Sequence, residues 1–105
     1  MAKEVMELSD GDFKSALAEN SGILLFYKKI CPHCKALKKV IEKVSIANPD
    51  LTVMQIDSEE NPAAMAELEI SRVPTLLVIR DGSIAARKSG LFNARELTAL
   101  IKGSA

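Results

Sequence analysis

The segment that most constrains this chain is Cys31-Pro32-His33-Cys34, which stands where an apolar run ends and a helical pattern begins. The run Ile23–Tyr27 is continuously apolar, which favours a central strand that is covered on both faces. The chain has no other cysteines. Two thiols at this spacing can close a disulfide on each other and reopen it on a partner, so any thiol chemistry takes place here.

Length and charge set the broad class. The 105 residues suffice for one core, and a single domain over residues 1–105 is expected. Lysines and arginines equal aspartates and glutamates at 14 each, which gives no overall attraction to nucleic acid or an anionic membrane. No apolar run approaches the roughly 20 residues of a membrane helix, and the N-terminus lacks the pattern of a secretory signal.

These properties favour a cytoplasmic protein that is a monomer, although a mature chain whose signal had been removed would look similar. In a reducing cytosol, a close cysteine pair is more often redox-active or metal-binding than structural.

Apolar periodicity and helix-breaking residues predict the order βαβαβαββα. Strands are predicted over Val5–Leu8, Ile23–Tyr27, Leu51–Asp57, Thr75–Arg80 and Ile84–Lys88. Helices are predicted from a Ser9-Asp10 cap to Asn20, over Lys35–Ala47, from Asn61-Pro62 to Leu68, and from an Asn93 cap through Ile101. Strand-helix-strand units imply parallel pairing, whereas the Asp81-Gly82 turn implies an antiparallel hairpin. The fold class is therefore α/β, with a mixed sheet and helices on both faces.

This arrangement resembles the thioredoxin family over essentially the whole chain. The resemblance rests on Cys-x-x-Cys at a helix start, on Val73-Pro74-Thr75 before a strand, on the Asp81-Gly82 hairpin and on Gly90 before the last helix. It implies a thioredoxin fold, in which four helices flank a central mixed sheet of four or five strands. It also implies a cis peptide bond before Pro74 and disulfide exchange as the activity.

The chain departs from the family pattern around the cysteines. Where thioredoxins usually have Trp-Cys-Gly-Pro-Cys, Ile30 replaces the tryptophan and Pro32-His33 replaces the dipeptide, so that the motif looks more like that of the periplasmic disulfide oxidases. The buried aspartate of many thioredoxins falls on Leu25, and we assign the lysine that accompanies it to Val53. Loss of both charges together avoids an unpaired interior charge, but no carboxylate is then expected to assist the second cysteine.

The predicted helix start gives the two thiols different roles. Cys31 at the N-cap and Pro32 at the first helical position leave the free N–H groups of the first turn facing the Cys31 sulfur, which lowers the pKa of its thiol. Cys34, one turn further, is expected to be buried and less acidic. Cys31 is therefore assigned as the attacking nucleophile and Cys34 as the resolving thiol.

His33 lies between the cysteines and is interpreted as a residue that tunes the redox potential. As a cation or a hydrogen-bond donor it would stabilise the thiolate, and with it the reduced form. Potentials on this fold run from about −270 mV to about −120 mV, and a value between them, less reducing than ordinary thioredoxin, is predicted. The alternative is that His33 is only an exposed helix residue.

A substrate groove is predicted opposite the cysteines. With Pro74 facing them, the Val73 backbone can pair with an extended substrate segment, and Ile30, Val73, Gly90 and Leu91 can line a shallow apolar groove. The alternative makes Pro74 merely the proline that starts a strand. Six lysines lie in or near the motif and its helix: Lys28, Lys29, Lys35, Lys38, Lys39 and Lys43. They form either a solvated helix face or a set of cations that favour the thiolate or attract an acidic partner.

Three function classes follow. The first is a thiol-disulfide oxidoreductase that acts on disulfide-containing proteins and binds no cofactor itself. It would receive electrons from a thioredoxin-reductase-like flavoprotein that uses a nicotinamide. A glutathione-linked, glutaredoxin-like role is a variant of this class. The second is a metal site in which Cys31, His33 and Cys34 bind zinc or a cuprous ion, which would need ligands from another chain. The third is a redox-idle adaptor on the same scaffold.

Overall fold

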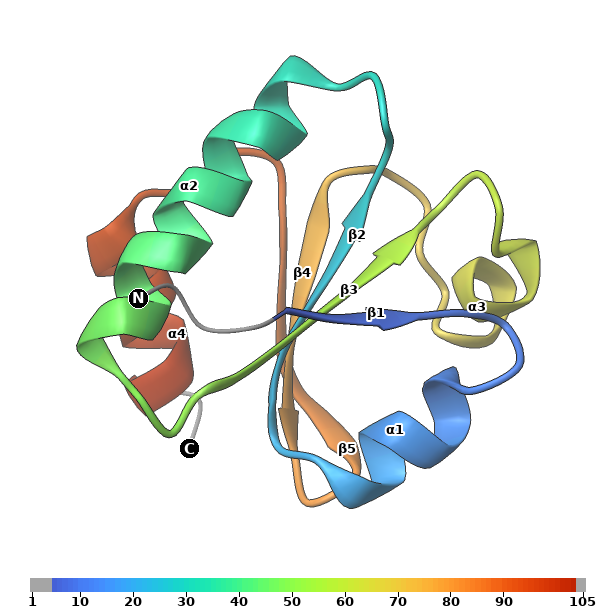
Figure 1. Ribbon diagram of the computed structural model, residues 1–105, viewed down its shortest axis with the longest axis horizontal. Coiled ribbons are helices and arrows are strands. Elements are labelled where there is room, and N and C mark those ends of the chain that lie inside the picture. Colours follow the sequence, from blue (N-terminus) through green and yellow to red (C-terminus); the bar gives the residue numbers. More distant parts are fainter. Residues whose placement is uncertain (1–4, 104–105) are drawn as a thin grey trace.

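The computed structural model describes residues 5–103, and a five-stranded sheet in the order β1-β3-β2-β4-β5 organises them (Figure 1). The strands are β1 (Val5–Leu8), β2 (Gly22–Tyr27), β3 (Thr52–Asp57), β4 (Thr75–Arg80) and β5 (Ser83–Ser89). The helices are α1 (Phe13–Glu19), α2 (Pro32–Ala47), α3 (Pro62–Glu67) and α4 (Ala94–Gly103). The predicted element order and the α/β class are confirmed, and the sheet has the larger of the two expected strand numbers.

Strand directions follow the connections. β1 and β2 each pair in parallel with β3, whereas β4 pairs antiparallel with β2 and with β5. β2 begins at Gly22, one residue before the predicted start, where a side chain would overlap the Thr52 carbonyl oxygen on β3. Only glycine permits this close approach of two backbones.

Two apolar layers lie on the faces of the sheet, and β2 contributes alternate residues to both. Ile23, Leu25 and Tyr27 belong to the layer under α2 and α4. Leu24 and Phe26 belong to the layer under α1 and α3. Figure 1 shows these helix pairs on opposite sides of the sheet. Coverage on both faces is the physical reason why β2 reads as an unbroken apolar run.

The start of α1 differs from the prediction. α1 begins after Asp12 rather than after Ser9-Asp10, because the Asp10 carboxylate accepts hydrogen bonds from the backbone N–H groups of Ala63 and Ala64, at 3.3 and 2.8 Å. Asp10 therefore caps α3 and not its own helix. α2 begins at Pro32, the first helical position expected from the proline, three residues ahead of Lys35, where the apolar periodicity starts.

α4 begins as predicted, after Asn93. The Asn93 side-chain oxygen accepts from the Glu96 N–H at 2.8 Å, and the Glu96 carboxylate accepts from the Asn93 N–H at 3.0 Å. This reciprocal pair is a capping box, which satisfies two backbone donors at the start of the helix.

Several chain segments converge at one end of the sheet. The parallel strands β2 and β3 end there at Tyr27 and Asp57, and both the N–H and the hydroxyl of Ser58 donate to the Tyr27 carbonyl at 2.9 Å. The antiparallel β4 begins at the same end, with Thr75 beside Phe26. The segments that carry Cys31 and Pro74 thus leave the sheet side by side.

Candidate redox site

Cys31 and Cys34 form a disulfide at the N-terminus of α2, with their Cα atoms 5.2 Å apart. Cys31 is the N-cap, with an extended backbone, and its sulfur accepts from the Cys34 N–H at 3.2 Å. Pro32 occupies the first turn, where a missing N–H costs no helical hydrogen bond. The cysteines and Pro32 therefore lie at the helix positions that the sequence predicts.

The two sulfurs have different access to solvent. Cys31 is partly exposed, whereas Cys34 is 1% exposed and packs in the apolar layer under α2 with Leu37 and Ile41. A partner can therefore reach the Cys31 side of the disulfide. His33, in the first turn, is exposed, and its imidazole has no hydrogen-bond partner within residues 5–103.

Pro74 is buried at the start of β4, and the Val73–Pro74 peptide bond is cis, as the family resemblance implies. The Gly90 N–H donates to the Pro74 carbonyl at 3.0 Å, and Gly90 itself has a φ of 80°. The Thr75 hydroxyl donates to the Arg72 carbonyl at 2.6 Å, and this hydrogen bond spans the turn that contains Val73 and Pro74. The structure thus joins Pro74 and Gly90 directly.

The predicted groove residues do not all meet in one place. Val73 is half-buried and packs, like Cys31, against the layer under α2. Ile30 is 93% exposed and Leu91 is 54% exposed, and neither belongs to that apolar layer. Both are large apolar side chains in solvent close in sequence to the site, which suits contact with a partner better than packing in the protein itself.

The charged pair that many thioredoxins bury is replaced by apolar and neutral residues. Leu25 is fully buried, and the β2–β3 register places Gln55 beside it, whereas Val53 lies beside Ile23. Our assignment of the lysine position to Val53 therefore does not match the strand register, because Gln55 is two residues further along β3. Leu25, Val53 and Gln55 line a cavity of about 260 Å³ between the sheet and α2.

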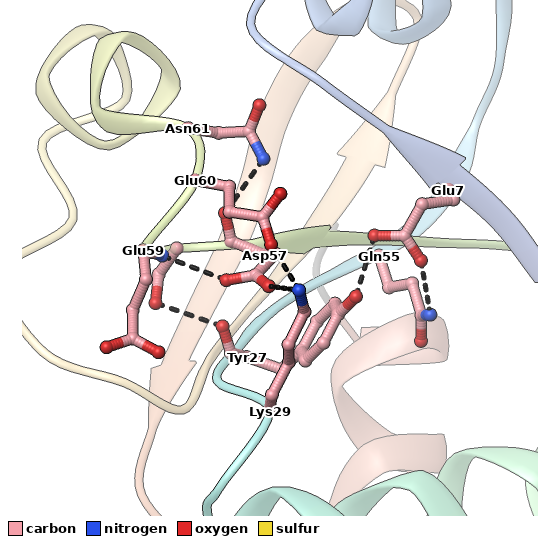
Figure 2. A network of polar contacts seen from close by, with 9 residues as sticks. Glu7, Tyr27, Lys29, Gln55, Asp57, Glu59, Glu60 and Asn61 are labelled. Atoms are coloured by element: carbon pink, nitrogen blue, oxygen red, sulfur yellow. Dashed lines mark hydrogen bonds and ion pairs between the residues drawn. The ribbon is translucent and has the colours of Figure 1, made fainter.

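A polar network that no sequence pattern predicts lies next to this cavity (Figure 2). The Tyr27 hydroxyl donates to the Glu7 carboxylate at 2.7 Å, and the Gln55 amide donates to the same carboxylate at 2.6 Å. The Lys38 ammonium lies 3.8 Å from the centre of the Tyr27 ring. Burial, followed by the hydrogen bond to Glu7, raises the pKa of the Tyr27 phenol, so Tyr27 remains a protonated donor.

Lys29, two residues before Cys31, is held by carboxylates. It pairs with Glu60, and its Nζ lies 3.8 Å from Asp57 Oδ2 (Figure 2). The Asp57 side chain is 7% exposed, and its Oδ1 accepts from the Glu59 N–H at 3.0 Å. The hydrogen bond to Glu60 and the nearby negative charges raise the pKa of Lys29. Asp57 and Glu60, which lie more than 20 positions after the motif in the sequence, thus reach the redox site through these contacts.

A disulfide at a helix N-terminus, with a buried proline at the same end of a mixed sheet, is the arrangement of a thiol-disulfide redox protein. The model of the thioredoxin family matches residues 4–103. The chain therefore belongs to the thioredoxin family.

Individual relatives agree with this assignment. A thioredoxin of Chlamydia pneumoniae is 31% identical over 94 residues, which are 90% of this chain and 92% of the relative. The solution structure of desulfothioredoxin from Desulfovibrio vulgaris Hildenborough in its reduced form has a TM-score of 0.80 and 38% identity, and the match covers 98% of this chain and 99% of that one. Thioredoxin f2 of Chlamydomonas reinhardtii, with a TM-score of 0.84 and 22% identity over 95% of both chains, supports the fold alone.

Family membership, together with the Cys31–Cys34 disulfide, makes this chain a thioredoxin-type thiol-disulfide oxidoreductase. The family suggests disulfide-containing substrates and a reductase as partners. Within residues 5–103, no helix is long and apolar enough to cross a membrane, and no group of three or more His, Cys, Asp or Glu side chains is placed to hold a metal ion.

Proposed function

We propose that the protein reduces disulfides of partner proteins through two consecutive thiol exchanges. The Cys31 thiolate attacks one sulfur of the substrate disulfide, forms a mixed disulfide and releases the first substrate thiolate. The Cys34 thiolate then attacks the Cys31 sulfur, forms the Cys31–Cys34 disulfide and releases the second substrate thiolate. Two electrons pass to the substrate, and both released thiolates take up protons from water according to their pKa values.

The single observation that supports these roles is the difference in burial between the cysteines. Cys31 is partly exposed at the helix N-cap, where the backbone N–H groups and the helix dipole favour a thiolate. Cys34 is 1% exposed and donates its N–H to the Cys31 sulfur. A buried thiol cannot meet an external disulfide first, but it is well placed to attack the mixed disulfide on Cys31.

The substrate segment binds, in this proposal, along Val73, Pro74 and Gly90, with Ile30 and Leu91 as exposed apolar contacts. The direct hydrogen bond from Gly90 to Pro74 and the exposure of both large side chains support this choice. Electrons return from a flavoprotein of the thioredoxin-reductase kind that uses a nicotinamide cofactor, so the chain itself needs no bound cofactor. We place the reaction in the cytoplasm and treat the acting species as a monomer.

We further propose that Pro32 and His33 set a potential that is less reducing than that of ordinary thioredoxin, between about −270 mV and about −120 mV. His33 is in the first turn of α2, between the cysteines, and its side chain is free to approach the Cys31 thiolate. Equilibration with a glutathione or dithiothreitol redox couple would give the value. A potential at or below about −270 mV excludes tuning by His33.

Trapping tests the order of the two thiols. The Cys34→Ser variant should accumulate mixed disulfides on Cys31, because the resolving step is removed, and mass spectrometry would identify the trapped partners. The matched Cys31→Ser variant retains only the buried thiol and should trap almost none. Equal trapping by both variants contradicts the assigned roles, and failure of the native protein to reduce insulin disulfides contradicts the function itself.

A further inference from the structure

Charge is distributed unevenly around the redox site, although the chain as a whole is balanced. Residues 28–41, which include both cysteines, contain five lysines and no aspartate or glutamate. The only acidic residue of α2 is Glu42. The local excess of positive charge therefore lies in the segment that carries the two cysteines.

The lysines of this region are not equivalent. Lys29 is neutralised by Glu60 and Asp57, and the half-buried Lys38 lies over the Tyr27 ring. Lys28 is exposed and precedes α2. On α2 itself, three exposed lysines have no carboxylate within 4.0 Å among residues 5–103: Lys35, Lys39 and, two residues beyond this region, Lys43. We call these three residues the α2 lysine stripe.

The stripe has a direction and a length. Its members are four residues apart and therefore lie on one side of the helix, over about 12 Å at 1.5 Å per residue. It starts at Lys35, directly after Cys34, and the Lys35 N–H donates to the Cys31 carbonyl at 3.2 Å. An extended segment of about four residues would span the stripe at roughly 3.3 Å per residue.

We propose that the α2 lysine stripe binds an acidic segment that flanks the reactive cysteine of the substrate protein. The inference rests on the proposed function, whose substrate class it specifies. On the other side of Lys29, the exposed Glu59 and Glu60 would repel such a segment. Attraction on α2 and repulsion at the β3–α3 turn together orient the acidic segment along α2 as the disulfide approaches Cys31.

The Cys31 thiolate cannot produce this preference, because an anion repels acidic substrates. An acidic preference must therefore come from surrounding cations, and at the surface such an effect acts over about one Debye length, roughly 8 Å at physiological ionic strength. The preference for acidic substrates should appear in the association rate constant and should weaken as salt is added.

Three peptides with the same disulfide and with acidic, neutral or basic flanking residues test the proposal. Stopped-flow measurement of their reduction by the reduced protein should show the acidic peptide reacting about three to ten times faster than the basic one at low salt. The advantage should largely disappear near 0.5 M salt, where the Debye length falls to about 4 Å. Equal rates for acidic and basic peptides, or a ratio insensitive to salt, overturn the proposal.

A charge reversal locates the effect. Lys39→Glu should lower the ratio of the acidic to the basic rate constant at least about twofold, and Lys102→Glu should leave that ratio unchanged. Lys102 is a suitable control because Arg80, at the far end of β4, donates to the Ile101 carbonyl at 2.6 Å and so places this end of α4 away from the redox site. If both variants change the ratio equally, net charge and not the stripe is responsible. If the neutral peptide is not reduced at all, the proposed function fails rather than this inference.

Discussion

At the scale of single residues, His33 is the group whose effect on the thiols can be isolated by mutation. Its imidazole is exposed and makes no hydrogen bond to another group within residues 5–103, so replacing it disturbs no packing. Any effect of His33 on the potential is therefore exerted from an exposed side chain in the first turn of α2.

His33→Gln should make the potential more negative by about 15 to 30 mV, which corresponds to about 0.7 to 1.4 kcal/mol for a two-electron couple. Glutamine preserves helix propensity and removes the imidazole. The change is measured by equilibrium with a thiol redox buffer, with Lys102→Gln as the control substitution at a remote exposed residue. An unchanged potential in His33→Gln would mean that His33 is only a surface residue.

Tyr27 offers a second test, because its pKa is raised by burial and by the bond to Glu7. The unfolded chain loses the phenol proton at its ordinary pKa near 10, whereas the folded chain retains it to higher pH. Between these values the unfolded state binds fewer protons, so the contribution of Tyr27 to stability is complete below pH 10 and is lost as pH rises further.

The free energy of unfolding of the native protein should therefore fall faster above about pH 10 than that of Tyr27→Phe. Below that pH, Tyr27→Phe should cost about 0.5 to 1.5 kcal/mol for the lost hydrogen bond. Urea unfolding at several pH values measures both effects. Lysines titrate in the same range, so the informative quantity is the difference between the two proteins, and parallel pH profiles would contradict the prediction.

At the scale of elements, the cap of α3 comes from outside the helix. Asn61 is its N-cap but makes no side-chain capping bond; its amide donates to the Asp57 carbonyl at 2.8 Å, and its side-chain oxygen accepts from the Asp10 N–H, also at 2.8 Å. Asp10 in turn accepts from the first turn of α3. The turn before α1 and the start of α3 are thus held as one unit.

Asp10→Ala should lower the free energy of unfolding by about 1 to 2 kcal/mol, since helix caps contribute amounts of this order. Asp50→Ala, a similar change at an exposed position, should cost less than about 0.5 kcal/mol. Chemical denaturation of both variants gives the comparison. If the Asp10→Ala and Asp50→Ala variants have the same free energy of unfolding, water replaces the Asp10 cap with no loss of stability, and the prediction is contradicted.

At the scale of the whole molecule, local sequence signals were sufficient to predict the order of elements. The unbroken apolar run of β2, the Asp81-Gly82 turn and the Asn93 cap each act through near neighbours, and the structure confirms all three. The helix positions of Cys31 and Pro32 are equally local, since they depend on proline at a helix start.

Contacts between distant residues were not predictable in this way. Asp10 and Ala64 are 54 positions apart, and Glu7 and Gln55 are 48 apart. No pattern in the sequence distinguishes these side chains from ordinary surface residues, because their partners are fixed only when β1, β3 and α3 come together. For the same reason, the placement of Asp57 and Glu60 on Lys29 became visible only in the assembled fold.

The position of Tyr27 gives the protein an optical signal of its own. The chain has no tryptophan and one tyrosine, and that tyrosine lies between the Lys38 ammonium of α2 and the Glu7 carboxylate of β1. Its fluorescence therefore comes from a single site where helix and sheet meet. Changes at that contact, during unfolding or when a partner binds over α2, can be followed without attaching a dye.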